Sequence, residues 1–147
     1  MSNHEIAPLR PGRDLDLKVA LEIMDYIWVT HWLRFSAEMA VKWIGTQQEI
    51  DEAGGVFTTV KPADFQELKH RENFDEAVPK YTTDITQSMK VIAKMTDIGF
   101  EYTLTEEILN DQIRYCAEFT KTGSQARFCA ETKAEAITKA ALLAILG

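Results

Sequence analysis

Residues 112–131 read QIRYCAEFTKTGSQARFCAE, and residues 132–146 continue as TKAEAITKAALLAIL. The first stretch has the alternation of two strands joined by a loop, residues 120–125, around Gly123. The second stretch is apolar over a wide face, and Thr132 followed by Glu135 makes the pattern of a helix capping box. These residues therefore predict an antiparallel hairpin followed by a docked C-terminal helix.

A single strand register satisfies both faces of this hairpin. On one face each large side chain lies opposite a small one, and on the other face opposite charges meet. The pairs are Phe119 with Ala126, Ala117 with Phe128, Tyr115 with Ala130, Glu118 with Arg127, and Arg114 with Glu131. A slip by one residue would destroy both patterns, so the register is well determined.

The same register places Cys116 directly across from Cys129, and the chain has no other cysteine. Two cysteines are too few for a structural zinc site, which needs four ligands, so the sequence predicts no metal site. In a reducing cytosol we expect thiols that fill the sheet face as small apolar residues. Redox switching by the pair is the alternative. We expect a solvated loop at Glu106, Glu107 and Asp111, with cation binding as the alternative.

Patterns elsewhere predict further elements. Residues 83–99 predict a helix with Ile85, Met89, Ile92 and Met95 on one face and Gly99 at its end. Alternation over residues 100–105 predicts a strand. A helix is expected from Asp14, with an apolar stripe that runs to Ile27. Residues 27–35 and 56–60 are rich in β-branched and aromatic side chains and predict strands, although a helical stripe is an alternative for the first of them.

Composition limits the function classes. The chain has 147 residues and a net charge of −7, which fits one domain and argues against binding to a nucleic-acid duplex. The apolar stretches are shorter than the roughly 20 residues of a membrane span, and the N-terminus lacks the apolar core of a signal peptide. We expect a cytoplasmic protein without membrane contact.

Three blocks of the chain resemble one family. They are residues 9–16 with Val19-Ala20 and Ile23-Met24, residues 81–85 with Val91-Ile92 and Lys94-Met95, and residues 131–132 with 136–137 and 139–144. Together they resemble the phage ABA sandwich domain family, small phage and prophage proteins without an assigned activity. The match covers roughly the first 28 residues and everything from about Tyr81 onward.

The resemblance implies an α+β fold, a three-layer α/β/α sandwich around a central, mainly antiparallel sheet. It implies a single domain over residues 1–147, in which residues 29–80 form a divergent, insert-like region. No motif in the match specifies a reaction, and fold analogy alone says little about function.

Two groups of residues are candidates for binding. A helix N-terminus with hydroxyls and ammonium or guanidinium groups could hold an anionic ligand. These ligand-binding candidates are Lys80, Tyr81, Thr82, Thr83, Arg34 and Arg71. Simple helix capping is the alternative, and it is favoured because Asp84 would repel a phosphate. The partner-binding candidates are the aromatic set Trp28, His31, Trp32, Phe35 and Trp43, for which a core or subunit interface is the alternative.

Three functions are compatible with these features. The favoured hypothesis is a non-enzymatic phage accessory protein that binds a host protein through residues 28–71. The second is a protein that sequesters a small nucleotide or phosphorylated ligand, such as a host defence signal. The third is an enzyme without a recognisable motif. No cofactor is predicted, and self-association into a homo-oligomer is compatible with all three hypotheses.

Overall fold

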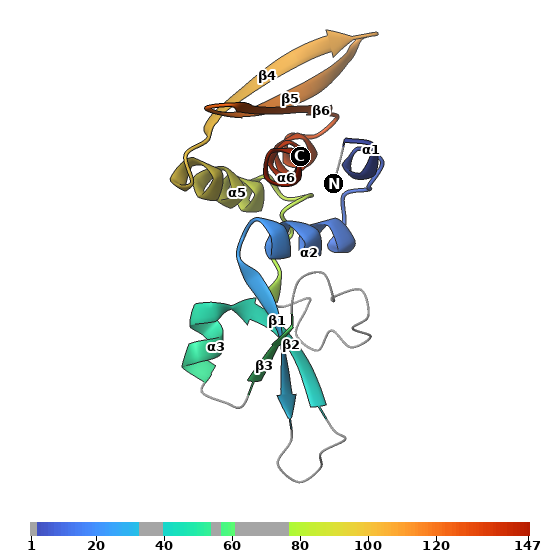
Figure 1. Cartoon of the computed structure of the whole chain (residues 1–147). Helices are drawn as coiled ribbons and strands as arrows, with labels where there is room; N and C mark the ends of the chain where they lie inside the picture. The colour runs from blue at the N-terminus through green and yellow to red at the C-terminus, as the bar shows by residue number, and fades with distance from the viewer. Residues whose placement is uncertain (1–2, 33–39, 54–56, 61–76) are drawn as a thin grey trace. The chain divides into compact units, whose positions relative to one another are not determined.

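The computed structural model describes residues 3–32, 40–53, 57–60 and 77–147 (Figure 1). The chain divides into two compact units, Met1–Val19 with Lys80–Gly147, and Ala20–Pro79. The second unit largely coincides with the region at 29–80 that was expected to diverge from the family and to be insert-like. The single domain over residues 1–147 stays a prediction.

In the first unit, three strands form an antiparallel sheet in the order β4-β5-β6. The strands are β4 (Glu101–Leu109), β5 (Gln112–Lys121) and β6 (Ser124–Ala130). The predicted register is confirmed at each residue pair from Phe119 with Ala126 to Tyr115 with Ala130. Gly123 takes a φ of +81° in the tight turn, a conformation that glycine adopts without a Cβ penalty.

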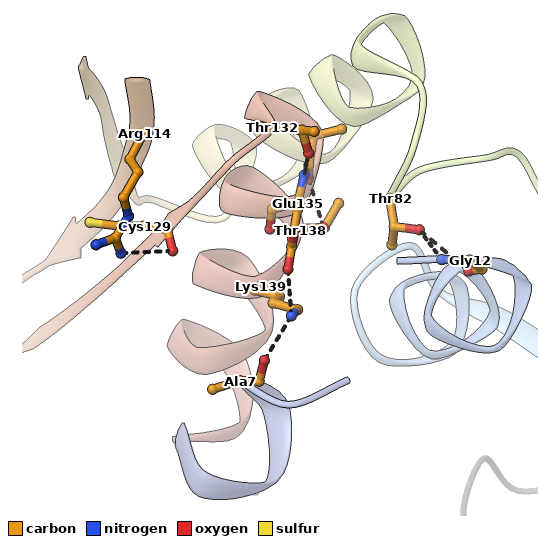
Figure 2. Close-up of polar contacts among 10 residues, drawn as sticks. Ala7, Gly12, Thr82, Arg114, Cys129, Thr132, Glu135, Thr138 and Lys139 are labelled. Atoms are coloured by element: carbon orange, nitrogen blue, oxygen red, sulfur yellow. Dashed lines mark hydrogen bonds and ion pairs between the residues drawn. The ribbon is translucent and has the colours of Figure 1, made fainter. Parts of the chain in front are cut away.

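Helix α6 (Lys133–Leu146) packs against β5 and β6 and forms the centre of this unit's core. Its small and apolar residues, among them Ala136, Ile137, Ala140 and Ala141, are buried, as the sequence predicted. The Thr132 hydroxyl accepts a hydrogen bond from the Glu135 amide at 3.2 Å, which confirms the N-cap (Figure 2).

Lys139 is a buried cation in the middle of α6, only 2% exposed. Its Nζ pairs with Glu135 Oε2 at 2.7 Å and donates to the Ala7 carbonyl at 2.8 Å (Figure 2). It also lies 5.0 Å from the centre of the Phe128 ring. A buried ammonium is tolerated only when it is paired and hydrogen-bonded, and these contacts meet that need. Lys139 thereby joins α6 to the backbone just after α1 (Asn3–Ile6).

Helix α5 (Ile85–Asp97) is confirmed, and Gly99 beyond it has a φ of +104°. The predicted apolar face is only partly buried. Ile85 and Met89 are 43% and 60% exposed, whereas Ser88, Val91 and Met95 are buried on the side that packs against α6. Ser88 can be buried because its hydroxyl donates to the Ile85 carbonyl at 2.8 Å.

In the second unit the described strands form a sheet of order β2-β1-β3. They are β1 (Tyr26–Trp32), β2 (Ala40–Thr46) and β3 (Phe57–Val60), with α3 (Gln47–Ala53) after β2. The strands predicted at 27–35 and 56–60 are confirmed as far as the structure describes them. Helix α2 (Arg13–Glu22), which links the units in sequence, ends earlier than predicted, because Asp25 takes a left-handed φ of 61° and Ile27 already belongs to β1.

The α+β class and the antiparallel pairing are therefore confirmed. The described strands lie in two three-stranded antiparallel sheets, where the expectation named one central sheet. The sequence could not show this, because alternation identifies a strand but does not identify its neighbour. In the first unit α6 covers one face of the sheet, with α5 beside it (Figure 1).

If α6 is the centre of the core, shortening a buried side chain of this helix should destabilise the protein far more than shortening an exposed side chain near its end. We expect Ile137→Ala to lower the free energy of unfolding by about 2–5 kcal/mol, because Ile137 is 1% exposed. Ile145→Ala, on the same helix at 36% exposure, is the matched control and should cost clearly less. Urea unfolding followed by circular dichroism measures both, and equal losses would contradict this account of the core.

Candidate functional site

A buried carboxylate organises the segment that was predicted to bind an anion. Asp16 in α2 is fully buried, and its Oδ1 accepts from the Thr82 amide at 2.8 Å and from the Thr82 hydroxyl at 2.6 Å. Its Oδ2 pairs with Arg13 Nη1 at 2.9 Å. The Thr82 hydroxyl oxygen also accepts from the Gly12 amide at 2.9 Å (Figure 2). The donors of Thr82 are therefore satisfied from within the protein.

This arrangement separates the predicted ligand-binding residues. Tyr81 and Thr82 are buried, while Lys80 and Thr83 are exposed. Asp84 caps α5, and its Oδ1 accepts from the Thr86 amide at 2.9 Å. Asp16 occupies the position beside Thr82 that an anionic ligand would need, and Asp84 adds a second negative charge at the helix start. Arg34 and Arg71 lie outside the described residues, and ligand binding by this segment stays a prediction.

The aromatic candidates fall mainly outside what the structure describes in side-chain detail. Trp28 in β1 is fully buried, so this side chain does not offer a surface for a partner. The backbones of His31 and Trp32 lie in β1, and that of Trp43 lies in β2 opposite Val29. Phe35 lies outside the described residues. Partner binding by this set stays a prediction.

The outer face of the β4-β5-β6 sheet carries a cluster of polar side chains and sulfur. The register aligns Thr105, Cys116 and Cys129 in one row across the sheet, and α6 packs against the sheet on the side of Phe128. Arg127 Nη2 pairs with Glu107 Oε1 at 2.7 Å. Glu107 and Arg127 stand on opposite sides of the cysteine row in the register, so their ion pair crosses that row.

Cys116 and Cys129 form a disulfide with an S–S distance of 2.09 Å. The expectation of two thiols is therefore wrong for this structure, although their predicted opposition is confirmed. Facing cysteines on neighbouring antiparallel strands are close enough to bond, whatever small apolar role they also have. The Arg114 guanidinium lies beside them and donates from Nη2 to the Cys129 carbonyl at 3.4 Å (Figure 2).

Arg127 pairs with Glu107 rather than with Glu118, its predicted neighbour. Glu107 also belongs to the group of described residues whose ligand atoms could hold a metal ion, together with both cysteines. The expected loop at Glu106 and Glu107 is wrong, because β4 continues through both residues to Leu109. On the sheet's inner side, burial raises the pKa of the Tyr102 phenol, whose ring centre lies 5.3 Å from that of Phe119.

The far end of the β4–β5 hairpin is a second feature. β6 pairs with β5 only from Tyr115 onward, so residues 107–114 form a two-stranded ribbon that extends beyond β6 (Figure 1). The turn residues Asn110 and Asp111 have φ values of 52° and 64°, as a tight hairpin turn requires. Three large apolar side chains are exposed near this turn: Ile108 at 78%, Leu109 at 52% and Ile113 at 51%. We call these three residues the hairpin tip.

Sequence reasoning considered Glu107 only as a cation ligand beside Glu106 and Asp111, and it did not predict the Asp16–Thr82 contact or the hairpin tip. Asp16 and Thr82 both lie in blocks that carry the family resemblance, which was the available signal for a contact between them. Glu107 could have been found by extending the β4 alternation two residues past Thr105 onto the cysteine face. The exposure of the tip had no local signal, because isoleucine in a strand is usually buried.

Comparison with known proteins supports the fold. No protein-family model and no curated protein matches the chain. The structure is similar to the crystal structure of a phage protein from Bacillus cereus ATCC 14579, with a TM-score of 0.51 and 16% sequence identity. The similarity covers 93% of this chain and 93% of that chain. At this identity the likeness concerns fold alone. The phage setting and membership of the ABA sandwich family stay predictions.

Among the residues that the structure describes, no helix is both long and apolar enough to span a membrane. A cytoplasmic location stays a prediction.

The Asp16–Thr82 contact leads to a matched pair of substitutions. Thr82→Val removes a buried hydroxyl that donates to Asp16 and accepts from Gly12, so we expect a loss of about 1–3 kcal/mol in the free energy of unfolding. Thr83→Val makes the same chemical change at the next residue, which is exposed, and should change stability by less than about 0.5 kcal/mol. Chemical unfolding of both variants measures the difference, and equal effects would refute the role of Thr82.

Proposed function

We propose that this protein is a non-enzymatic phage accessory protein that acts by binding a host protein, and that the hairpin tip is a contact surface. The observation that carries the proposal is the exposure of Ile108, Leu109 and Ile113 together at the end of a projecting ribbon. Single exposed apolar residues are ordinary, but here Ile108 and Ile113 are paired across the two strands and Leu109 is exposed on the opposite face, and such a grouping marks an interaction surface. The fold likeness to a phage protein supports the biological setting.

The charge around the tip indicates the chemistry of the partner. Glu106, Glu107 and Asp111 lie within two residues of the tip in sequence, and Arg114 is the nearby cation. Glu107 is already paired with Arg127, while Glu106 and Asp111 are exposed. An apolar groove with a basic rim would therefore complement this end of the hairpin.

A host protein fits this surface better than a second copy of the same chain. Two copies that met tip to tip would bring their acidic side chains together, and the whole chain already carries a net charge of −7. Like charges in contact disfavour association. Binding of the tip in a basic groove avoids this cost and covers the exposed isoleucines.

Crosslinking at the tip tests the proposal. A photoreactive residue in place of Gln112, which is exposed beside the turn, should give one discrete adduct in a lysate of the bacterial host. Ile108→Thr with Ile113→Thr removes the apolar surface but keeps β-branched side chains, so we expect at least a tenfold loss of adduct with little change in stability.

Met89→Gln is the matched control, because it replaces an exposed apolar side chain outside the hairpin tip with a polar one. Met89 lies on α5 and is 60% exposed. Its adduct yield should equal that of the unsubstituted protein. The proposal fails if no adduct forms, if the adduct joins two copies of this chain, or if the double substitution leaves the yield unchanged.

A further inference from the structure

We propose that the reduced Cys116–Cys129 pair, together with Glu107, forms a binding site for a thiophilic divalent cation such as Zn²⁺, and that disulfide formation expels the ion. In the structure the two sulfur atoms and a Glu107 carboxylate oxygen all lie within 4.8 Å of one another. Zinc–ligand distances of about 2.3 Å for sulfur and about 2.0–2.2 Å for oxygen are reached from such a spacing by side-chain rotation.

The donor set suits zinc. Two thiolates and one carboxylate supply three ligands, and the fourth tetrahedral position is left to water. The sheet register adds a carboxylate from β4 to the two cysteines, which residue spacing within one segment does not show. The ligands carry three negative charges when deprotonated, one more than the ion neutralises.

The neighbouring cation Arg127 compensates this excess negative charge. Arg127 Nη2 binds Glu107 through Oε1 at 2.7 Å, which leaves Oε2 to serve as the ligand atom. Carboxylates that bind a metal are themselves usually hydrogen-bonded to an outer partner that holds them in place. Arg114, which donates to the Cys129 carbonyl, adds a further positive charge beside the pair.

The sheet preserves the site when the disulfide is broken. β5 and β6 are paired from Tyr115 to Lys121 by their own ladder, so the cysteines stay opposite each other without the S–S bond. Cys129 is partly exposed, whereas Cys116 is 2% exposed. A thiolate of a cellular dithiol therefore attacks the Cys129 sulfur and releases Cys116 as the leaving thiolate.

The exchange balances in two steps. The dithiol loses two electrons and two protons and becomes a disulfide, while the protein disulfide gains them and becomes two thiols. Binding of the cation then releases two thiol protons as the sulfur atoms become ligands. Oxidation of the two thiolates by a small-molecule disulfide reverses the sequence and frees the ion.

Cobalt and zinc titrations test the inference. The chain is reduced with a trialkylphosphine, which becomes the phosphine oxide, and the phosphine is removed before Co²⁺ is added without oxygen. We expect about one ion per chain with a thiolate-to-cobalt charge-transfer band, displaced by Zn²⁺. The oxidised chain should bind neither ion at the same concentrations. A reduced chain without the band, or an oxidised chain that binds equally, would overturn the proposal.

Two carboxylate variants separate ligation from general charge. Glu107→Gln should weaken cobalt binding by on the order of tenfold or more, whereas Glu106→Gln makes the same change on the adjacent residue, which points to the other face of β4, and should leave affinity unchanged. Both variants keep the cysteines and are titrated in the same reduced state, so any effect of breaking the disulfide is common to the two. Equal affinities for the two variants would show that Glu107 is not a ligand and would refute the three-ligand site.

Discussion

The contact between Asp16 and Thr82 is the constraint on which the first unit depends. The chain leaves that unit after Val19 and returns to it at Lys80, and Asp16 and Thr82 stand just inside these two points. Two residues far apart in sequence are thus joined, because the buried Asp16 carboxylate accepts hydrogen bonds from both the amide and the hydroxyl of Thr82. Closing a long loop costs conformational entropy. Buried hydrogen bonds to a charged group, placed where the loop begins and ends, offset part of that cost.

From this contact the rest of the unit follows in layers. Thr82 lies two residues before Asp84, which caps α5. Helix α5 packs on α6 through Val91 and Met95, and α6 covers one face of the β4-β5-β6 sheet. The alanines of α6 permit close approach to the strands. Lys139, buried but fully partnered, ties the same helix to the N-terminal segment. One face of the sheet is therefore covered by α6 and forms part of the core.

The other face and the end of the hairpin are then available for binding. Strand alternation puts Cys116, Cys129 and Glu107 on the face away from α6, where Cys116 is buried while Glu107 and part of Cys129 are exposed. The ribbon beyond β6 lacks a third strand, so its isoleucines have no core to enter. Both proposals, a host-protein contact at the tip and a metal site at the cysteine row, use parts of the sheet that α6 does not cover.

Much of the local structure could be predicted because it depends on local patterns. The hairpin register, the Thr132 cap, the Gly99 stop and the strand at Phe57–Val60 each follow from residue spacing. The sequence by itself determined these elements, the facing cysteines and the α+β class. Only the tertiary structure decided that the strands form two sheets, that Asp16 fills the predicted anion position, and that Glu107 meets the cysteines. The physical reason is that periodicity within a segment specifies which residues share a face, whereas burial, partner choice and exposure depend on segments distant in the chain.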